Sequence, residues 1–91
     1  MEREKIQSYI EPRRALFWSV GKNRTHEISD PLLVETILNF GTQEDVHELF
    51  RVLGLKRVAE VFFEATRGRS RHNYFPQVEN FFRLYFERYA R

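Results

Sequence analysis

The sequence predicts an all-α protein: a compact single-domain bundle of four main helices plus a short N-terminal helix. Three observations carry this prediction. Cap residues stand before several apolar segments, the apolar residues recur with the 3.6-residue period of a helix, and alternating stretches of strand length are absent. With 91 residues, the chain is long enough for one domain, 1–91, in which residues 1–11 are expected to be loosely ordered.

The N-terminal part gives the weakest signals. Glu2 to Tyr9 is compatible with one or two helical turns. Pro12 suits the first position of a short helix that carries Ala15, Leu16, Phe17 and Trp18, because proline needs no backbone donor there. A loop is expected from Gly21 to His26.

The first of the main helices has clear boundaries. Ser29 and Asp30 are typical capping residues, and Pro31 follows at the first helical position. The helix is predicted to run to Phe40. Gly41 is expected to end it in the left-handed conformation that glycine adopts without steric cost.

The next helix begins at once. Thr42 is the predicted cap, and Asp45 lies three residues later, where a capping box needs a side-chain acceptor. One helical face then carries four apolar residues at spacings of three and four: Val46, Leu49, Phe50 and Leu53. Gly54 is expected to stop this helix.

Two further helices, over 55–66 and from Pro76 to Tyr89, have unusually wide apolar faces. Their apolar residues cover arcs of roughly 200°, whereas a surface helix needs about 100°. Either both helices lie centrally in the bundle, or another protein covers part of them. On the second interpretation, the last helix is expected to contact a partner through Phe82, Phe86 and Tyr89.

Composition places the protein among soluble globular domains. Hydrophobic residues make up 42% and charged residues 31%, with a net charge of +2. Cysteine is absent, which excludes disulfides and thiolate zinc sites and fits a reducing cytoplasm, so a cytoplasmic location is expected. No apolar run approaches the roughly 20 residues of a membrane span.

The sequence offers no constellation typical of catalysis. His26, His47 and His72 are not paired at helical metal-ligand spacing, and the four glycines are scattered singly rather than gathered in a phosphate-binding loop. We therefore expect a non-enzyme with no cofactor and no metal; a small enzyme is the least favoured class.

The densest basic segment precedes the last helix. Arg67, Arg69 and Arg71 are followed by Tyr74 and Phe75, so cations and rings are interleaved as in single-strand nucleic-acid binders. The same arginines also suit docking onto a protein partner. A solvated loop whose arginines cap the preceding helix remains the alternative.

Several segments together resemble a known family. They are Leu16-Phe17-Trp18, then 35–41 (Glu-Thr-Ile-Leu-Asn-Phe-Gly), then Glu44-Asp45-Val46, then a helix that ends in Leu53-Gly54. This pattern, which covers Leu16 to about Phe86, resembles small bacterial domains of unknown function that look like antitoxin partners of AbiEii-type nucleotidyltransferase toxins. The family usually has Asp where Ser19 stands and Arg where Thr36 stands.

The resemblance implies a protein-interaction module, an antitoxin-like partner of a nucleotidyltransferase toxin, with no active site of its own. The residues favour the same class, because aromatic anchors and arginines dominate such contacts. The competing hypothesis is a nucleic-acid-binding or autoregulatory domain that uses 67–75, with a homodimer as one form of it.

Overall fold

The all-α prediction is confirmed. The computed structural model describes residues 2–17, 28–67 and 73–90, and within these ranges the chain contains helices and no strand. Five α-helices and one 3₁₀ helix follow one another: α1 (Glu2–Ile10), η1 (Glu11–Phe17), α2 (Asp30–Phe40), α3 (Gln43–Leu53), α4 (Leu55–Thr66) and α5 (Pro76–Tyr89).

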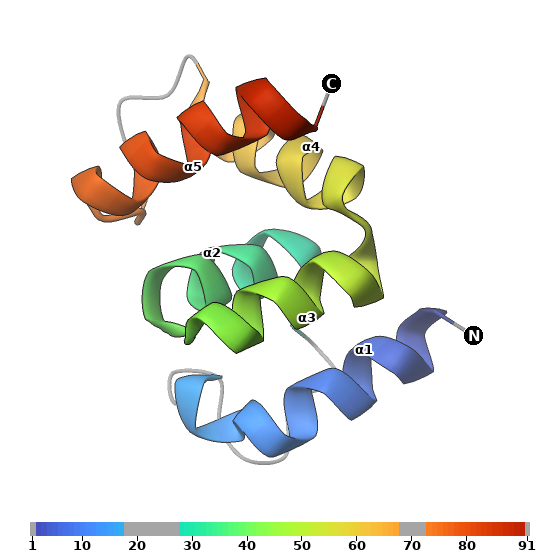
Figure 1. Cartoon of the computed structure of the whole chain (residues 1–91). Helices are drawn as coiled ribbons and strands as arrows, with labels where there is room; N and C mark the ends of the chain where they lie inside the picture. Colours follow the sequence, from blue (N-terminus) through green and yellow to red (C-terminus); the bar gives the residue numbers. More distant parts are fainter. Residues whose placement is uncertain (1, 18–27, 68–72, 91) are drawn as a thin grey trace.

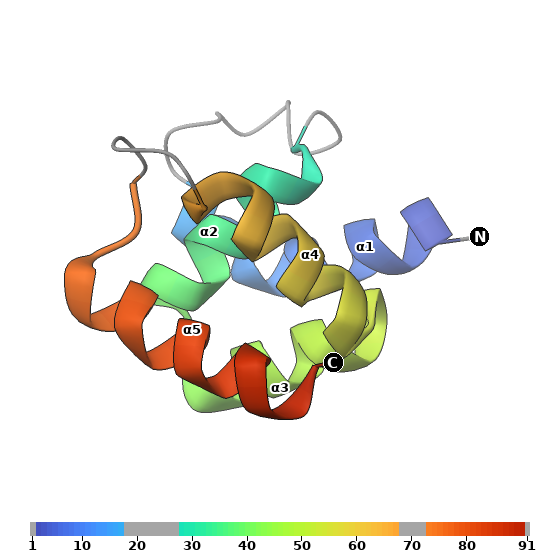
Figure 2. The ribbon, with the colours of Figure 1, turned by 90° about the horizontal axis from the view of Figure 1, so that it is seen from above.

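The helices form three levels (Figure 1). α1 and η1 lie on one side, α2 and α3 lie in the middle, and α4 and α5 lie on the other side. α1 packs on α3, η1 on α2, and α4 on both α2 and α3. Figure 2, the view from above, shows α5 running along the outside of the bundle next to α3 and α4. This position leaves one long flank of α5 at the surface.

The N-terminal segment contributes more to the core than the sequence analysis expects. Ile6, Tyr9 and Ile10 are at most 5% exposed, and Phe17 at the end of η1 is also buried. The spacing of three and four residues in α1 places its apolar side chains on one helical face. The apolar face of α1 therefore packs on the bundle. The chain bends at Arg13, where the backbone leaves helical geometry.

Both predicted helix caps are confirmed. At the start of α2, the Ser29 hydroxyl accepts the Leu32 backbone N–H at 3.3 Å. At the start of α3, the Thr42 hydroxyl accepts the Asp45 N–H at 3.1 Å, and the Asp45 carboxylate accepts the Thr42 N–H at 2.9 Å. These reciprocal bonds make a complete capping box, which fixes the direction in which α3 leaves the turn.

Gly41 ends α2 by a different mechanism from the one predicted. Its backbone is extended (φ −77°, ψ 163°) and not left-handed. Glycine is needed here for space, because a Cβ atom would lie 2.8 Å from the Ile37 carbonyl oxygen and 3.0 Å from the Asp45 Cβ. The tight approach of α2 to the first turn of α3 therefore depends on the missing side chain.

Among the glycines in the described residues, Gly54, between α3 and α4, has a positive φ of 92°. Nothing lies within 4 Å of a Cβ built at this position, so backbone conformation rather than space selects glycine. The turn lets α4 fold back against α2 and α3, and Val58 and Phe62 of α4 become fully buried.

Aromatic rings make up the part of the core beneath α5. Phe62 of α4 lies with its ring centroid 5.3 Å from that of Phe86 and 5.0 Å from that of Tyr74, both in edge-to-face geometry. Phe82 stacks on Phe86 at 5.6 Å. Such ring pairs add about 0.5–1.5 kcal/mol each beyond their buried area, so this cluster anchors α5 on the bundle.

Candidate interaction surface

The structure corrects the predicted contact face of α5. Phe82 and Phe86 are only 8% and 1% exposed, and Tyr74 before the helix is 4% exposed. All three pack in the core; Tyr74 and Phe86 are not available to a partner, and Phe82 offers only a small edge to the groove described below. Burial raises the pKa of the Tyr74 hydroxyl, with the nearby Glu35 charge adding to the effect. Of the predicted α5 contacts, only Tyr89 lies at the surface, with 57% of its area exposed.

The exposed apolar residues of α5 lie beside the predicted ones. Phe81 is 58% exposed and Leu84 is 53% exposed. A wide apolar arc has a middle and two edges, and the middle of this arc packs on the bundle while one edge reaches solvent. The spacing of apolar residues predicts the width of the arc but not which part of it faces the bundle. It therefore did not identify Phe81 and Leu84 as the exposed residues.

α5 faces α3 across an open apolar groove of about 450 Å³. Its α5 side carries Gln77, Val78, Phe81, Phe82 and Tyr85. The opposite side is formed by the end of α2, the turn and α3: Leu38, Gly41, Thr42, Gln43, Val46, His47 and Phe50. This volume lies in the range of about 300–1,000 Å³ that is typical of ligand pockets.

Ring contacts join the two walls of this α3–α5 groove. The Phe50 ring of α3 stacks on the Tyr85 ring of α5, with centroids 5.8 Å apart and planes inclined by 21°. Phe81 in turn stacks on Tyr85 at 6.2 Å. His47 is exposed at the rim, and its ring lies 6.3 Å from that of Phe50. The groove therefore combines an apolar, aromatic interior with a polar edge.

Asn39 at the end of α2 fixes where α5 begins. Its side-chain amide donates to the Asn73 carbonyl at 2.9 Å and accepts the Phe75 N–H at 3.2 Å. Next to it, the Phe40 and Phe75 rings meet edge to face at 5.3 Å. These contacts hold the entry to α5 against α2, and so they set the width of the groove at that end.

Of the predicted arginine contacts, the structure describes Arg67. This residue is exposed, and its guanidinium carbon lies 4.0 Å from the centroid of the Phe63 ring. Stacking on the ring holds the cation at the end of α4. Arg69 and Arg71 lie outside the described residues.

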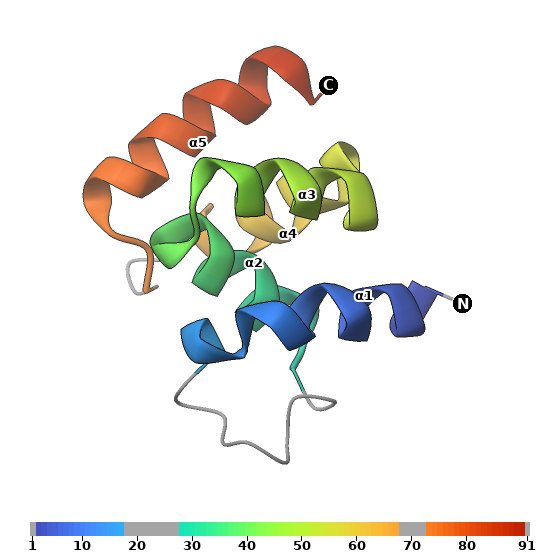
Figure 3. The same ribbon diagram turned by 60° about the horizontal axis from the view of Figure 1, so that its bottom comes forward.

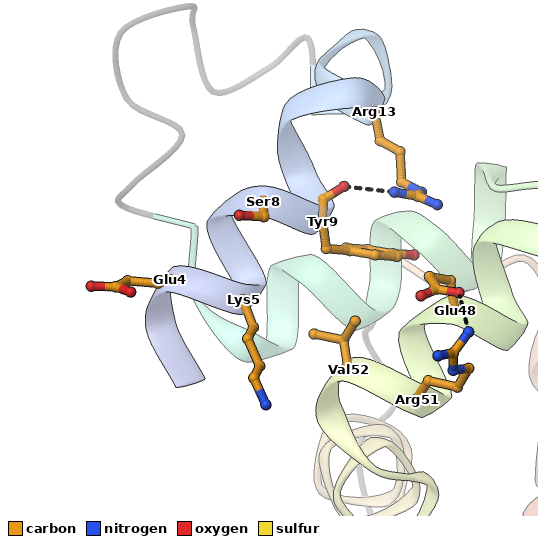
Figure 4. Close-up of a pocket in the computed structure, with 8 residues that line it drawn as sticks. All are labelled: Glu4, Lys5, Ser8, Tyr9, Arg13, Glu48, Arg51 and Val52. Atoms are coloured by element: carbon orange, nitrogen blue, oxygen red, sulfur yellow. Dashed lines mark hydrogen bonds and ion pairs between the residues drawn. The ribbon is translucent and has the colours of Figure 1, made fainter. Parts of the chain in front are cut away.

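A second, charged cleft of about 760 Å³ lies between α1 and α3 (Figure 4). It is lined by Glu4, Lys5, Ser8, Tyr9, Arg13, Glu48, Arg51 and Val52. The Arg13 guanidinium donates to the Tyr9 carbonyl at 2.7 Å and lies over the Tyr9 ring at 4.0 Å. The Tyr9 hydroxyl donates to the Asp45 carbonyl at 2.6 Å.

The electrostatics of this cleft are largely balanced within the protein. Burial raises the pKa of Tyr9, and the adjacent Arg13 charge offsets part of that effect. Arg51 pairs with Glu48 at 3.3 Å, and Arg13 pairs with Asp45 at 2.9 Å. The Arg51–Glu48 pair lies within α3, whereas Tyr9 of α1 and Arg13 of η1 both bind Asp45 of α3. We therefore regard the cleft as part of the scaffold.

The described ranges hold neither a metal-binding cluster nor a membrane-spanning helix. In residues 2–17, 28–67 and 73–90, no three His, Asp or Glu side chains gather as a metal site would require. None of the helices in these ranges has both the length and the hydropathy needed to cross a bilayer. No protein-family model, curated protein or solved structure matches this chain.

Proposed function

We propose that this protein is a non-catalytic protein-interaction module whose contact surface is the α3–α5 groove. The observation that carries the proposal is the groove itself, an apolar hollow of about 450 Å³ with Phe81 more than half exposed at its edge. Protein interfaces are typically centred on aromatic anchors packed in such hollows, surrounded by a polar rim.

The energetics favour covering the groove together with the exposed flank of α5 beside it. Phe81 and Leu84 each leave more than half of their area in water. Complete burial of such a side chain is worth about 1.5–3 kcal/mol, so a partner that covered both would gain roughly 2–3 kcal/mol from these two residues. Divided between the two residues, this is about 1–1.5 kcal/mol each, more than most interface residues contribute.

The resemblance suggests the class of partner. We propose an antitoxin-like role in which the groove docks onto a nucleotidyltransferase toxin of the abortive-infection type. Thr36, where the resembled family usually has Arg, is only 7% exposed within α2. This position is therefore assigned to the scaffold here, and the partner contact is assigned to the groove.

Co-expression tests the proposal. The chain is produced together with the product of the neighbouring gene, which the proposal requires to be a nucleotidyltransferase, and the mixture is run on a sizing column. We expect the two proteins to elute together, and we expect Phe81→Asp to separate them. Ala15→Asp is the matched control, since it places the same charge on exposed η1, across the bundle from α5. Separate elution of the wild-type proteins would refute the antitoxin-like role.

The alternative, nucleic-acid binding through 67–75, has less support. Tyr74 is buried, so one of the two rings that the basic-aromatic pattern offers cannot stack on a base. Phe75 is 46% exposed but is engaged with Phe40. Anisotropy with labelled DNA and RNA at two salt concentrations distinguishes the functions, because binding through arginines weakens as salt rises.

A further inference from the structure

The large apolar side chains that remain exposed gather along one helix. In the described ranges they are Phe81, Leu84 and Tyr89 of α5, Phe75 immediately before it, and Phe40, whose ring packs on that of Phe75. Figure 3 shows α5 at the edge of the bundle, on the side away from α1, so its outer flank is open to another molecule. Single exposed apolar residues are ordinary on a protein surface, whereas a group of them marks a contact site.

The outer line of α5 has the spacing of a helix-pairing seam. Gln77, Phe81, Leu84 and Arg88 follow one another at intervals of four, three and four residues, and all four are exposed. This spacing places them on one line of the helix, like the a and d positions of a coiled coil. The two apolar residues occupy the middle, and a polar residue stands at each end. The pattern is therefore the same when it is followed from either end of the helix.

From this symmetry we infer that two copies of the chain associate through α5, with the two helices antiparallel across a two-fold axis midway between Phe81 and Leu84. In a two-fold contact each copy presents the same patch to the other. Phe81 then packs on Leu84 of the second copy, and Gln77 lies opposite Arg88 of the second copy. The side-chain carbonyl of Gln77 can accept a hydrogen bond from that guanidinium.

The charges on α5 favour the antiparallel over the parallel arrangement. Parallel helices would set Arg88 beside Arg88 and Glu87 beside Glu87 of the second copy, and like charges in such positions repel. In the antiparallel register the two Arg88 residues are 11 positions apart, about 16 Å along the helix axis. Arg83 lies near the two-fold axis but about 100° around the helix from Leu84. Its guanidinium donates to Asn80 at 2.8 Å and pairs with Glu87 at 3.7 Å, so its charge is balanced within its own helix.

The area available is close to what a specific dimer needs. Four exposed rings leave about half of their surface in water, or roughly 100 Å² each for rings of about 150–250 Å². In this register Tyr89 comes opposite the start of α5 in the second copy, beside its Phe40–Phe75 ring pair. With Leu84, the rings supply roughly 500 Å² per copy, or about 1,000 Å² in total. Polar residues along the flank add to this area, and specific interfaces begin at about 1,200 Å². We therefore expect a weak, reversible dimer.

The dimer goes beyond the proposed function, because it forms without any other protein. The two are linked through shared residues, since the partner proposed above would also cover Phe81 and Leu84. A bound partner therefore excludes the second copy, and the dimer is the form that the chain takes until the partner replaces it.

Sedimentation velocity of the full chain tests the dimer, at concentrations from about 1 μM to 0.5 mM. We expect Leu84→Asp to abolish the dimer and Ala15→Asp, on exposed η1, to leave it unchanged. Gln77→Glu should tighten the dimer by about fivefold, because two symmetry-related ion pairs with Arg88 form. Gln77→Lys should weaken it by a similar factor, because it opposes two cations.

The double variant Gln77→Lys/Arg88→Glu tests the register itself. Its two new charges are 11 residues apart on one helix, about 16 Å, so they cannot pair within a single copy. Tighter association than that of Gln77→Lys alone therefore requires a pair between copies. All the substituted positions are exposed, and circular dichroism of each variant should show unchanged helix content.

Three results would overturn the inference: a wild type that sediments as a monomer at every concentration, a dimer that Leu84→Asp leaves intact, or equal dissociation constants for Gln77→Glu and Gln77→Lys. The proposed function fails separately. A monomeric wild type that co-elutes with the neighbouring gene product would remove only the dimer. A dimer that never co-elutes with that product would remove only the antitoxin-like role.

Discussion

Arg13 and Asp45 form an ion pair that joins the N-terminal segment to the capping box of α3. The Arg13 Nε donates to Asp45 Oδ1 at 2.9 Å, and both side chains are only 19% exposed. The second oxygen of the same carboxylate accepts the Thr42 N–H. The Asp45 carboxylate therefore completes the capping box of α3 and also accepts a hydrogen bond from Arg13, 32 positions earlier in the chain.

Removing this carboxylate should destabilise the fold more than removing a neighbouring one. We expect Asp45→Ala to lower the free energy of unfolding by roughly 2–3 kcal/mol, since it removes a cap worth about 1 kcal/mol and a charged hydrogen bond. Glu44→Ala is the control, because it removes an exposed charge from the same turn and should cost about 0.5 kcal/mol. Urea unfolding measures both values, and equal losses would contradict the assigned role of Asp45.

The contribution of Asp45 should depend on pH. Its pKa lies below the ordinary value of 3.8, first because the carboxylate accepts the Thr42 backbone N–H, with Arg13 adding to the effect. A lowered folded-state pKa means that the stabilisation is complete above the unfolded value and is lost as pH falls through the folded one. The difference in unfolding free energy between wild type and Asp45→Asn should therefore be constant from pH 7 to about 5 and shrink below about pH 4. A difference that grows in acid would contradict this sign.

Asn39 should control the local stability of α5. Asn39→Ala removes both hydrogen bonds to the segment before the helix, at an expected cost of about 0.5–1.5 kcal/mol for each bond. Asn39→Asp keeps an acceptor for Phe75 but sets a carboxylate against the Asn73 carbonyl, so it should also destabilise. The measurement is the hydrogen-exchange rate of the Phe75 amide, which should rise in both variants. Asn80→Ala, an exposed asparagine in α5 itself, should leave that rate unchanged.

The two turn glycines should respond to alanine for different reasons. Gly41→Ala brings a Cβ to within 2.8 Å of a backbone oxygen, so α2 and α3 must move apart. Gly54→Ala has room for the methyl group but strains a backbone at φ 92°, at a cost of about 1–3 kcal/mol. Both variants should unfold at lower urea concentration. Only Gly41→Ala should shift the NMR signals of the groove residues Val46 and Phe50, and identical spectra for the two would count against this distinction.

The sequence determined the helices well because caps and periodicity act locally. Thr42 and Asp45 are three residues apart, so their capping box is visible without a structure. The Asn39 bonds reach residues 34 and 36 positions away, and no local pattern marks them. In α1, the spacing of Ile6, Tyr9 and Ile10 is helical. Whether these side chains are buried depends on the packing of α3 against α1, which the local sequence does not show.

The sequence analysis did not predict the α3–α5 groove, because it could not tell which side of α5 faces the bundle. Phe81 and Phe82 illustrate this point. Their rings lie 5.0 Å apart, yet Phe81 is 58% exposed and Phe82 is 8% exposed. The sequence analysis chose Phe82 rather than Phe81 as the contact, because only the docking of α5 decides which of the two turns inward. Phe82→Ala should lower the free energy of unfolding by about 3 kcal/mol or more, as expected for a ring removed from a packed core. Phe81→Ala should change it by less than about 1 kcal/mol, because a half-exposed ring leaves no internal cavity.

In the co-elution assay the order should reverse, with Phe81→Ala weakening the complex at unchanged stability. Equal losses of stability would mean that α5 is rotated from the orientation described, and the α3–α5 groove would then have different walls.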